Sequence, residues 1–169
     1  LEFKNPVVTA SGTFGYGIEF LDFFDVNELG GIGLKAVTPE ARYGNPVPRI
    51  SETPSGMLNA IGLANQGIDY FLTKIVPSLK PIKTNIIANI AGKTYEDYTD
   101  IADKLNDVQE IHAIEVNISC PNVKEGGIAF GQNPKSAATV LKEVRKKYNG
   151  VMIAKLSPNV TDITEFARI

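Results

Sequence analysis

The sequence is poor in the residues that build disulfides and zinc centres, since it contains one cysteine and one histidine. It also contains no tryptophan. A single thiol, Cys120, cannot form an internal disulfide or a cysteine-based zinc site. No metal site is therefore expected. One unpaired cysteine is typical of a reducing compartment, which predicts a cytoplasmic protein.

An excess of positive charge and long apolar runs are also lacking. The 169 residues carry 17 Lys and Arg against 19 Asp and Glu, so the net charge of -2 provides no basic surface for a nucleic-acid backbone. The apolar runs are far shorter than the roughly 20 residues that cross a bilayer, so no membrane span is expected. The composition favours a globular domain that acts on small molecules.

The two ends of the sequence look trimmed. It begins at Leu1 rather than at methionine, and it stops at Ile169 soon after Thr161 opens a new amphipathic segment. We therefore expect the chain to be a portion of a longer protein.

Short apolar runs typical of strands alternate with amphipathic runs typical of helices along the whole length. Strands are predicted at 6–10, 31–37, 85–91, 113–118 and 151–156, with helices at 18–24, 66–79, after Thr94 and after Asn133. A parallel sheet covered by helices is expected, and both a doubly wound open sheet and a (β/α)8 barrel fit the alternation. A full barrel takes about 250 residues. A barrel interpretation therefore makes residues 1–169 one partial domain covering about the first five strand-helix units.

One connection is much longer than the others. Residues 38–65 are rich in Pro, Gly and Asn and are predicted to form a loop, and loops of this size usually carry function.

Polar side chains stand at or just after the end of each predicted strand. In parallel α/β folds these ends meet at one edge, where ligands bind. The residues concerned are Ser11, Lys35, Asn89, Asn117, Ser119 and Lys155. Glu115 is expected on the same strand face as Asn117, and burial would require it either to pair with a lysine or to be satisfied by a ligand.

The loop after the fourth predicted strand contains the only thiol. A lone cysteine is usually a small buried apolar residue. Here Pro121 restricts Cys120 to an extended conformation, and Asn117 and Asn122 place carboxamides on both sides of it. Such groups suit recognition of a planar ring with alternating donors and acceptors.

Several motifs together resemble the class 1 dihydroorotate dehydrogenases. They are ASGTFGYG at 10–17, Lys35, GNPVPRI at 44–50, NAIGL at 59–63, IANIAG at 87–92 and NISCPNVKEGGIAFGQ at 117–132. The last motif is similar to that of class 1B. There a catalytic FMN subunit pairs with a subunit that carries FAD and a 2Fe-2S cluster and passes electrons to NAD. The resemblance implies a TIM barrel that oxidises dihydroorotate to orotate in pyrimidine biosynthesis, as a homodimer within a heterotetramer.

The resemblance also implies roles for particular residues. Contacts to FMN fall on Ser11, Lys35, Ala36, Asn89, Asn117 and Lys155. Contacts to dihydroorotate fall on Lys35, Asn59, Ala60, Ile61, Gly62, Leu63, Asn117 and Asn122. Cys120 matches the catalytic base, and Lys155 would stabilise the negative charge of the reduced flavin.

Two other functions remain compatible with the sequence. A flavin barrel similar to dihydropyrimidine dehydrogenase would share the fold and the cysteine, although that group typically has histidine where Asn122 stands. A barrel without redox chemistry that binds a phosphorylated ligand is the third possibility.

Overall fold

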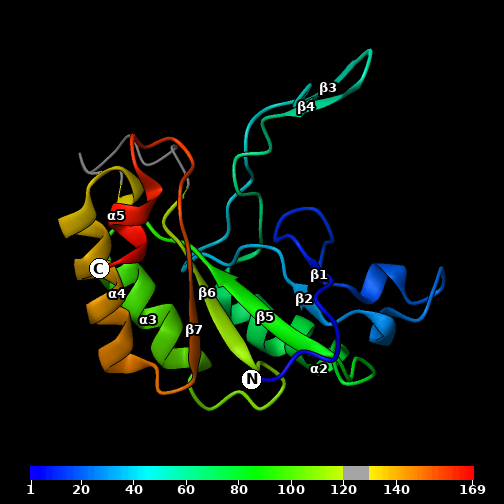
Figure 1. Cartoon of the computed structure of the whole chain (residues 1–169). Coiled ribbons are helices and arrows are strands. Elements are labelled where there is room, and N and C mark those ends of the chain that lie inside the picture. The colour runs from blue at the N-terminus through cyan, green and yellow to red at the C-terminus, as the bar shows by residue number, and fades with distance from the viewer. Residues whose placement is uncertain (120–129) are drawn as a thin grey trace.

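The computed structural model describes residues 1–119 and 130–169 and contains one parallel sheet (Figure 1). Its strands are β1 (Val8–Thr9), β2 (Gly31–Gly33), β5 (Asn85–Ile90), β6 (Ala113–Asn117) and β7 (Val151–Lys155), and they lie side by side in that order. Because the order follows the chain without reversal, each strand extends the same edge, as in a barrel wall. A doubly wound sheet instead reverses at a switch point. The prediction of a partial barrel with these strands is confirmed.

Helices cover one face of the sheet. Three of them, α3 (Tyr95–Leu105), α4 (Pro134–Lys147) and the short α5 (Ile163–Ala167), pack side by side (Figure 1). Thr94 and Asp97 form a reciprocal capping box at the start of α3. Asn133 accepts from the backbone N–H groups of Lys135 and Ser136 at the start of α4. Both caps are therefore those that the sequence predicts.

The helix predicted at 66–79 contains a widened turn. It runs as α1 (Gly67–Tyr70), the π-helical η3 (Phe71–Ile75) and α2 (Val76–Ser78). Pro77 lacks a backbone N–H, and its ring would collide with the carbonyl of Thr73 in a regular α-helix. The wider hydrogen-bond spacing of a π turn relieves this conflict. Short 3-10 turns complete the helical elements: η1 (Ile18–Phe20), η2 (Val26–Glu28) and η4 (Phe130–Gln132).

The central strands separate an apolar face from a polar one. Ile86, Ala88 and Ile90 of β5 and Ile114 and Val116 of β6 are fully or almost fully buried within the main hydrophobic core. The helices contribute Tyr98, Ile101, Leu105, Val140 and Val144 to the same core. Since side chains alternate along a strand, the intervening residues face the opposite side, which is the inside of the barrel wall. Asn89, Glu115 and Asn117 are on that side.

The long connection is not only a loop, which corrects the prediction for residues 38–65. It contains an antiparallel hairpin of β3 (Ile50–Thr53) and β4 (Gly56–Asn59), in which Ile50 pairs with Asn59. Every residue of these strands is exposed, and the hairpin projects from the sheet (Figure 1). Without a buried face the strands show no apolar alternation, so the pattern used to predict the other strands is missing.

No helix among the described residues combines the length and the apolar character needed to span a bilayer.

Asn65 closes the base of the long connection. Its side chain is buried, and its Oδ1 accepts from the backbone N–H groups of Thr38 (3.3 Å) and Gly67 (2.8 Å). Its Nδ2 donates to the carbonyl of Leu63 at 2.8 Å. The side chain therefore joins the end of the β2 segment to the start of α1.

Replacing Asn65 with alanine is expected to lower the free energy of unfolding by about 2 to 3 kcal/mol, because buried backbone groups lose their partners. Chemical denaturation of the full-length protein measures this change. Asn149→Ala is the matched control, since Asn149 is exposed and its loss should cost less than about 0.5 kcal/mol. Equal unfolding midpoints for the two variants would contradict the role given to Asn65.

Candidate functional site

The polar side chains at the ends of the central strands converge as predicted. Backbone register places Asn89 of β5 beside Glu115 of β6, and Asn117 of β6 beside Lys155 of β7. Because the strands are parallel and neighbouring, these residues form one row across the carboxyl edge of the sheet. Ser11 joins them from the turn that follows β1.

A hydrogen-bond network links the members of this row. The Ser11 hydroxyl donates to Glu115 Oε1 at 2.7 Å, and the Asn89 side-chain amide donates to the same oxygen. Lys155 Nζ lies 3.3 Å from Ser11 Oγ and donates to it. The expectation that Glu115 needs a lysine or a ligand is therefore wrong, because a hydroxyl and a carboxamide satisfy it. Glu115 is also the member of the network that sequence reasoning did not include among the site residues.

Asn117 is fixed by contacts on both of its ends. Its Nδ2 donates to Asn89 Oδ1 at 3.3 Å, and its Oδ1 accepts from the hydroxyl of Ser119 at 2.8 Å. The Tyr98 hydroxyl of α3 donates to the Asn117 backbone carbonyl at 2.8 Å. Asn89 and Asn117 are buried, so these bonds hold the two carboxamides in place without water.

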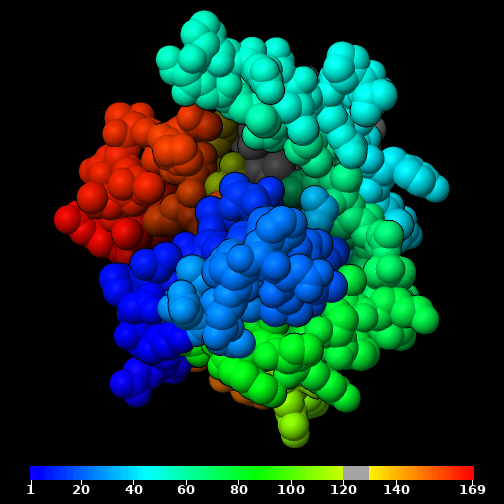
Figure 2. Space-filling view, turned by 90° about the vertical axis from the view of Figure 1, so that its right-hand side faces the viewer, coloured from blue at the N-terminus to red at the C-terminus, as the bar shows by residue number. Residues whose placement is uncertain are grey.

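A cavity of about 320 Å³ adjoins the network and brings together residues that are distant in the sequence. Its lining includes the predicted residues Ser11, Lys35, Ala36, Asn59, Ala60, Ile61, Gly62 and Leu63. The cavity lies between residues 11–13 and residues 59–64 at the base of the hairpin. Figure 2 shows the N-terminal part of the chain in blue below the hairpin segment in cyan. Ser11 belongs both to the cavity wall and to the polar network, so the cavity and the row of strand-end residues form one site.

Two features of the cavity wall suit ligand binding. The Lys35 side chain is half-buried and has no hydrogen-bond or ion-pair partner within the described part of the chain. Its ammonium is therefore available to an anionic ligand. Leu63 has φ of 56°, a left-handed conformation that costs energy in a residue other than glycine. Strain of this kind is concentrated at functional sites.

Two predicted site residues, Cys120 and Asn122, lie outside the described residues. Ser119, which immediately precedes Cys120, is described and contacts Asn117. Among residues 1–119 and 130–169, no group of three His, Cys, Asp or Glu side chains is arranged to hold a metal ion.

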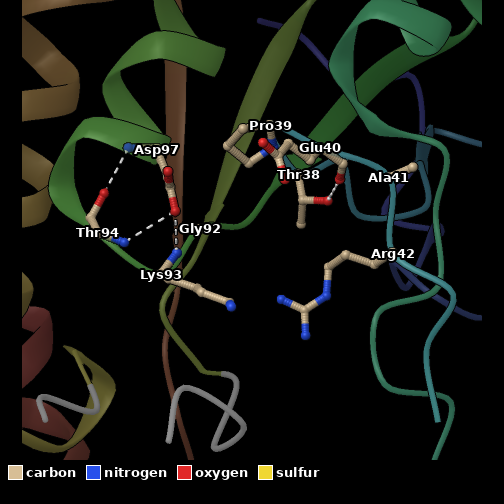
Figure 3. A pocket seen from close by; sticks show the side chains of 9 residues that line it. All are labelled: Thr38, Pro39, Glu40, Ala41, Arg42, Gly92, Lys93, Thr94 and Asp97. Carbon is tan, nitrogen blue, oxygen red and sulfur yellow. Dashed lines mark hydrogen bonds between the residues drawn. The ribbon is translucent and has the colours of Figure 1, made fainter. Parts of the chain in front are cut away.

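A larger cavity of about 470 Å³ contains none of the predicted residues (Figure 3). Arg42 and Lys93 extend into it from opposite sides. The backbone N–H groups of Lys93 and Thr94 at the start of α3 already donate to Asp97. Because the helix terminus is satisfied in this way, we place the functional site in the smaller cavity, which is connected to the buried polar network.

A parallel sheet wound in one direction, with hydroxyl, amide and lysine groups at its carboxyl edge, defines part of a (β/α)8 barrel with a ligand site at the top of the barrel. The model of the dihydroorotate dehydrogenase family matches residues 1–169. The chain therefore belongs to the dihydroorotate dehydrogenase family.

Curated relatives have the same family name. A protein of Bacteroides thetaiotaomicron called dihydroorotate dehydrogenase B (NAD(+)), catalytic subunit, is 58% identical over 168 residues, which cover 99% of this chain and 55% of that protein. Proteins with the same name from Parabacteroides distasonis and Desulforamulus reducens are 56% and 55% identical, again over 99% of this chain and 55% of their own length. The chain thus spans about 55% of the length of these relatives.

Proposed function

We propose that the protein to which this chain belongs is the catalytic subunit of a class 1B dihydroorotate dehydrogenase. It would oxidise dihydroorotate to orotate in pyrimidine biosynthesis and pass the electrons to NAD through a partner subunit. One observation supports this proposal most strongly. Three residues expected to contact a flavin, Ser11, Lys35 and Ala36, line one cavity with residues 59–63, which are expected to contact the dihydropyrimidine and are distant in the sequence. The other expected flavin contacts, Asn89, Asn117 and Lys155, are connected to this cavity through hydrogen bonds that lead to Ser11.

The donors and acceptors of the site suit FMN. Ser11, Asn89, Asn117 and Lys155 offer hydroxyl, carboxamide and ammonium groups of the kind that bind the polar edge of an isoalloxazine ring. Gly12 has φ of 88°, and a side chain there would meet only open space, so the wall is open beside Ser11. Bound FMN would accept the hydride removed from the substrate. Lys155 would supply positive charge to offset the negative charge of the reduced ring.

The cavity also offers suitable groups for dihydroorotate. Lys35 carries the unpartnered ammonium described above and would bind the substrate carboxylate or the polar edge of the flavin. Asn59 and the backbone of residues 60–63 would position the dihydropyrimidine ring, and Asn122 would add a further amide.

Cys120 would act as the base. Oxidation of dihydroorotate removes a proton from C5 and a hydride from C6, which leaves a double bond between these carbons. A free thiol has a pKa of about 8.5, so a modest decrease provides a thiolate near neutral pH. The Cys120 thiolate would accept the C5 proton, while the C6 hydride leaves toward the flavin.

The names of the relatives include the words catalytic subunit, which imply a partner subunit. We propose that this partner carries FAD and a 2Fe-2S cluster and joins a homodimer of catalytic chains in a heterotetramer. The compartment proposed is the cytoplasm.

Anaerobic reduction of the full-length protein tests this function. We expect a yellow protein whose flavin is bleached by dihydroorotate and not by dihydrouracil. Bleaching by dihydrouracil alone would favour a dihydropyrimidine dehydrogenase. A colourless protein that does not bind added FMN would favour the barrel without redox chemistry.

A further inference from the structure

Glu115 differs in its hydrogen-bonding capacity from the side chains around it. A carboxylate accepts hydrogen bonds and has no proton to donate, whereas serine and asparagine side chains can do both. Glu115 Oε1 accepts from Ser11 at 2.7 Å and from the Asn89 side-chain amide. It therefore determines which atoms these two neighbours turn toward it.

The first consequence concerns the two carboxamides. Asn89 must direct Nδ2 to Glu115, which leaves its Oδ1 to accept from Asn117 Nδ2 at 3.3 Å. Asn117 Oδ1 then faces the backbone N–H of Ser119, at 3.3 Å, which can only donate. The acceptor at Glu115 and the donor at Ser119 therefore require the same orientation of the two carboxamides that lie between them. Asn89 is 0% exposed, so water cannot replace the acceptor that Glu115 provides.

The second consequence concerns Lys155. Ser11 uses its hydroxyl proton in the bond to Glu115, so the Ser11 oxygen is left as an acceptor for Lys155 Nζ at 3.3 Å. Without the Glu115 acceptor the Ser11 side chain would lose the bond that fixes its rotamer, and its oxygen could move away from the ammonium. Lys155 would then lose the acceptor that holds it at this position.

We propose that Glu115 is a positioning residue, which orients Asn89 and Asn117 and holds Lys155 in place through Ser11. It does not line the cavity, and each of its effects passes through a residue that the proposed function places against the flavin. The inference rests on that proposed function. It adds that flavin affinity and the midpoint potential of the flavin depend on a hydrogen-bond acceptor at position 115 and not only on its negative charge.

Two substitutions separate the acceptor from the charge. Glu115→Gln removes the charge but retains one acceptor oxygen, whereas Glu115→Met removes both in a side chain of similar length. Loss of a nearby negative charge makes the flavin easier to reduce and raises its midpoint potential, and it does so equally in both variants. Loss of the fixed Lys155 makes the flavin harder to reduce and lowers the potential, and it occurs only in the methionine variant.

The measurements are the FMN dissociation constant and the two-electron midpoint potential of the full-length protein. We expect Glu115→Met to bind FMN about tenfold more weakly than Glu115→Gln. We also expect the midpoint potential of Glu115→Met to be lower than that of Glu115→Gln by about 30 mV. This difference is a roughly tenfold shift of the flavin toward its oxidised form. Ser11→Ala keeps the charge and removes the bridge to Lys155, so its potential should fall below that of the wild type.

Glu96 on α3 is exposed and supplies the control, since Glu96→Gln and Glu96→Met should both match the wild type. If Glu115→Gln and Glu115→Met bind FMN with the same dissociation constant and have the same midpoint potential, the role of Glu115 is overturned. The proposed function is not affected by that result. If Glu115→Met does not fold, Ser11→Ala provides the test. A midpoint potential of Ser11→Ala equal to that of the wild type would also overturn the role of Glu115. A wild type that binds no FMN would instead overturn the proposed function, and the inference with it.

Discussion

Replacing Lys155 with methionine is expected to slow flavin reduction by dihydroorotate at least about 100-fold, or to abolish flavin binding. The methionine side chain has similar length but no charge. Negative charge on the reduced ring would lose its counter-charge, and Ser11 would lose the ammonium that now lies 3.3 Å from its oxygen. Anaerobic stopped-flow absorbance of the full-length protein measures the rate, and fluorescence titration with FMN measures the affinity.

Lys142 provides the matched control for this substitution. It is exposed on α4, so Lys142→Met should leave both the reduction rate and the FMN affinity within about twofold of the wild type. A Lys155→Met protein that binds FMN and is reduced at the wild-type rate would refute the role proposed for Lys155.

Replacing Cys120 with alanine is expected to leave FMN bound while slowing its bleaching by dihydroorotate by about 100-fold to 10,000-fold, the usual contribution of a general base. The reason is that the C5 proton would have no acceptor at the site. Cys120→Ser should give an intermediate rate, because a hydroxyl has a much higher pKa than a thiol. Anaerobic absorbance at the flavin band follows the reaction.

Dithionite is the control for the cysteine variants, since it reduces flavin without a protein base. We expect Cys120→Ala and the wild type to bleach equally with dithionite and very differently with dihydroorotate. Bleaching of Cys120→Ala by dihydroorotate at the normal rate would remove Cys120 as the base.

Much of the fold could be predicted from local patterns. The apolar runs that predict strands end within a few residues of β5, β6 and β7. For β5 and β6 the reason is that their helix-facing sides are buried and need apolar residues. Thr94 and Asn133 were identifiable as caps because their side chains bond to residues only two or three positions away. The hairpin β3–β4 was missed because neither of its faces is buried.

The site was predictable in part. Residues at strand ends could be assigned to one edge, since parallel strands align their carboxyl ends there. The partners of Glu115 could not be predicted, because Ser11 comes from a distant turn and its position depends on packing. The way in which Lys35 and residues 59–63 share one cavity also depends on the path of the long connection, which no sequence periodicity specifies.

The hydroxyl of Tyr98 is buried beneath the strands and reaches the backbone of Asn117 from the helical layer. Through this contact a substitution in the helical layer can act on a strand end of the site. A phenylalanine at position 98 would preserve the ring and most of the core, yet it would release the peptide that carries the Asn117 carboxamide. The position of a site amide therefore depends on a helix residue that does not line the cavity.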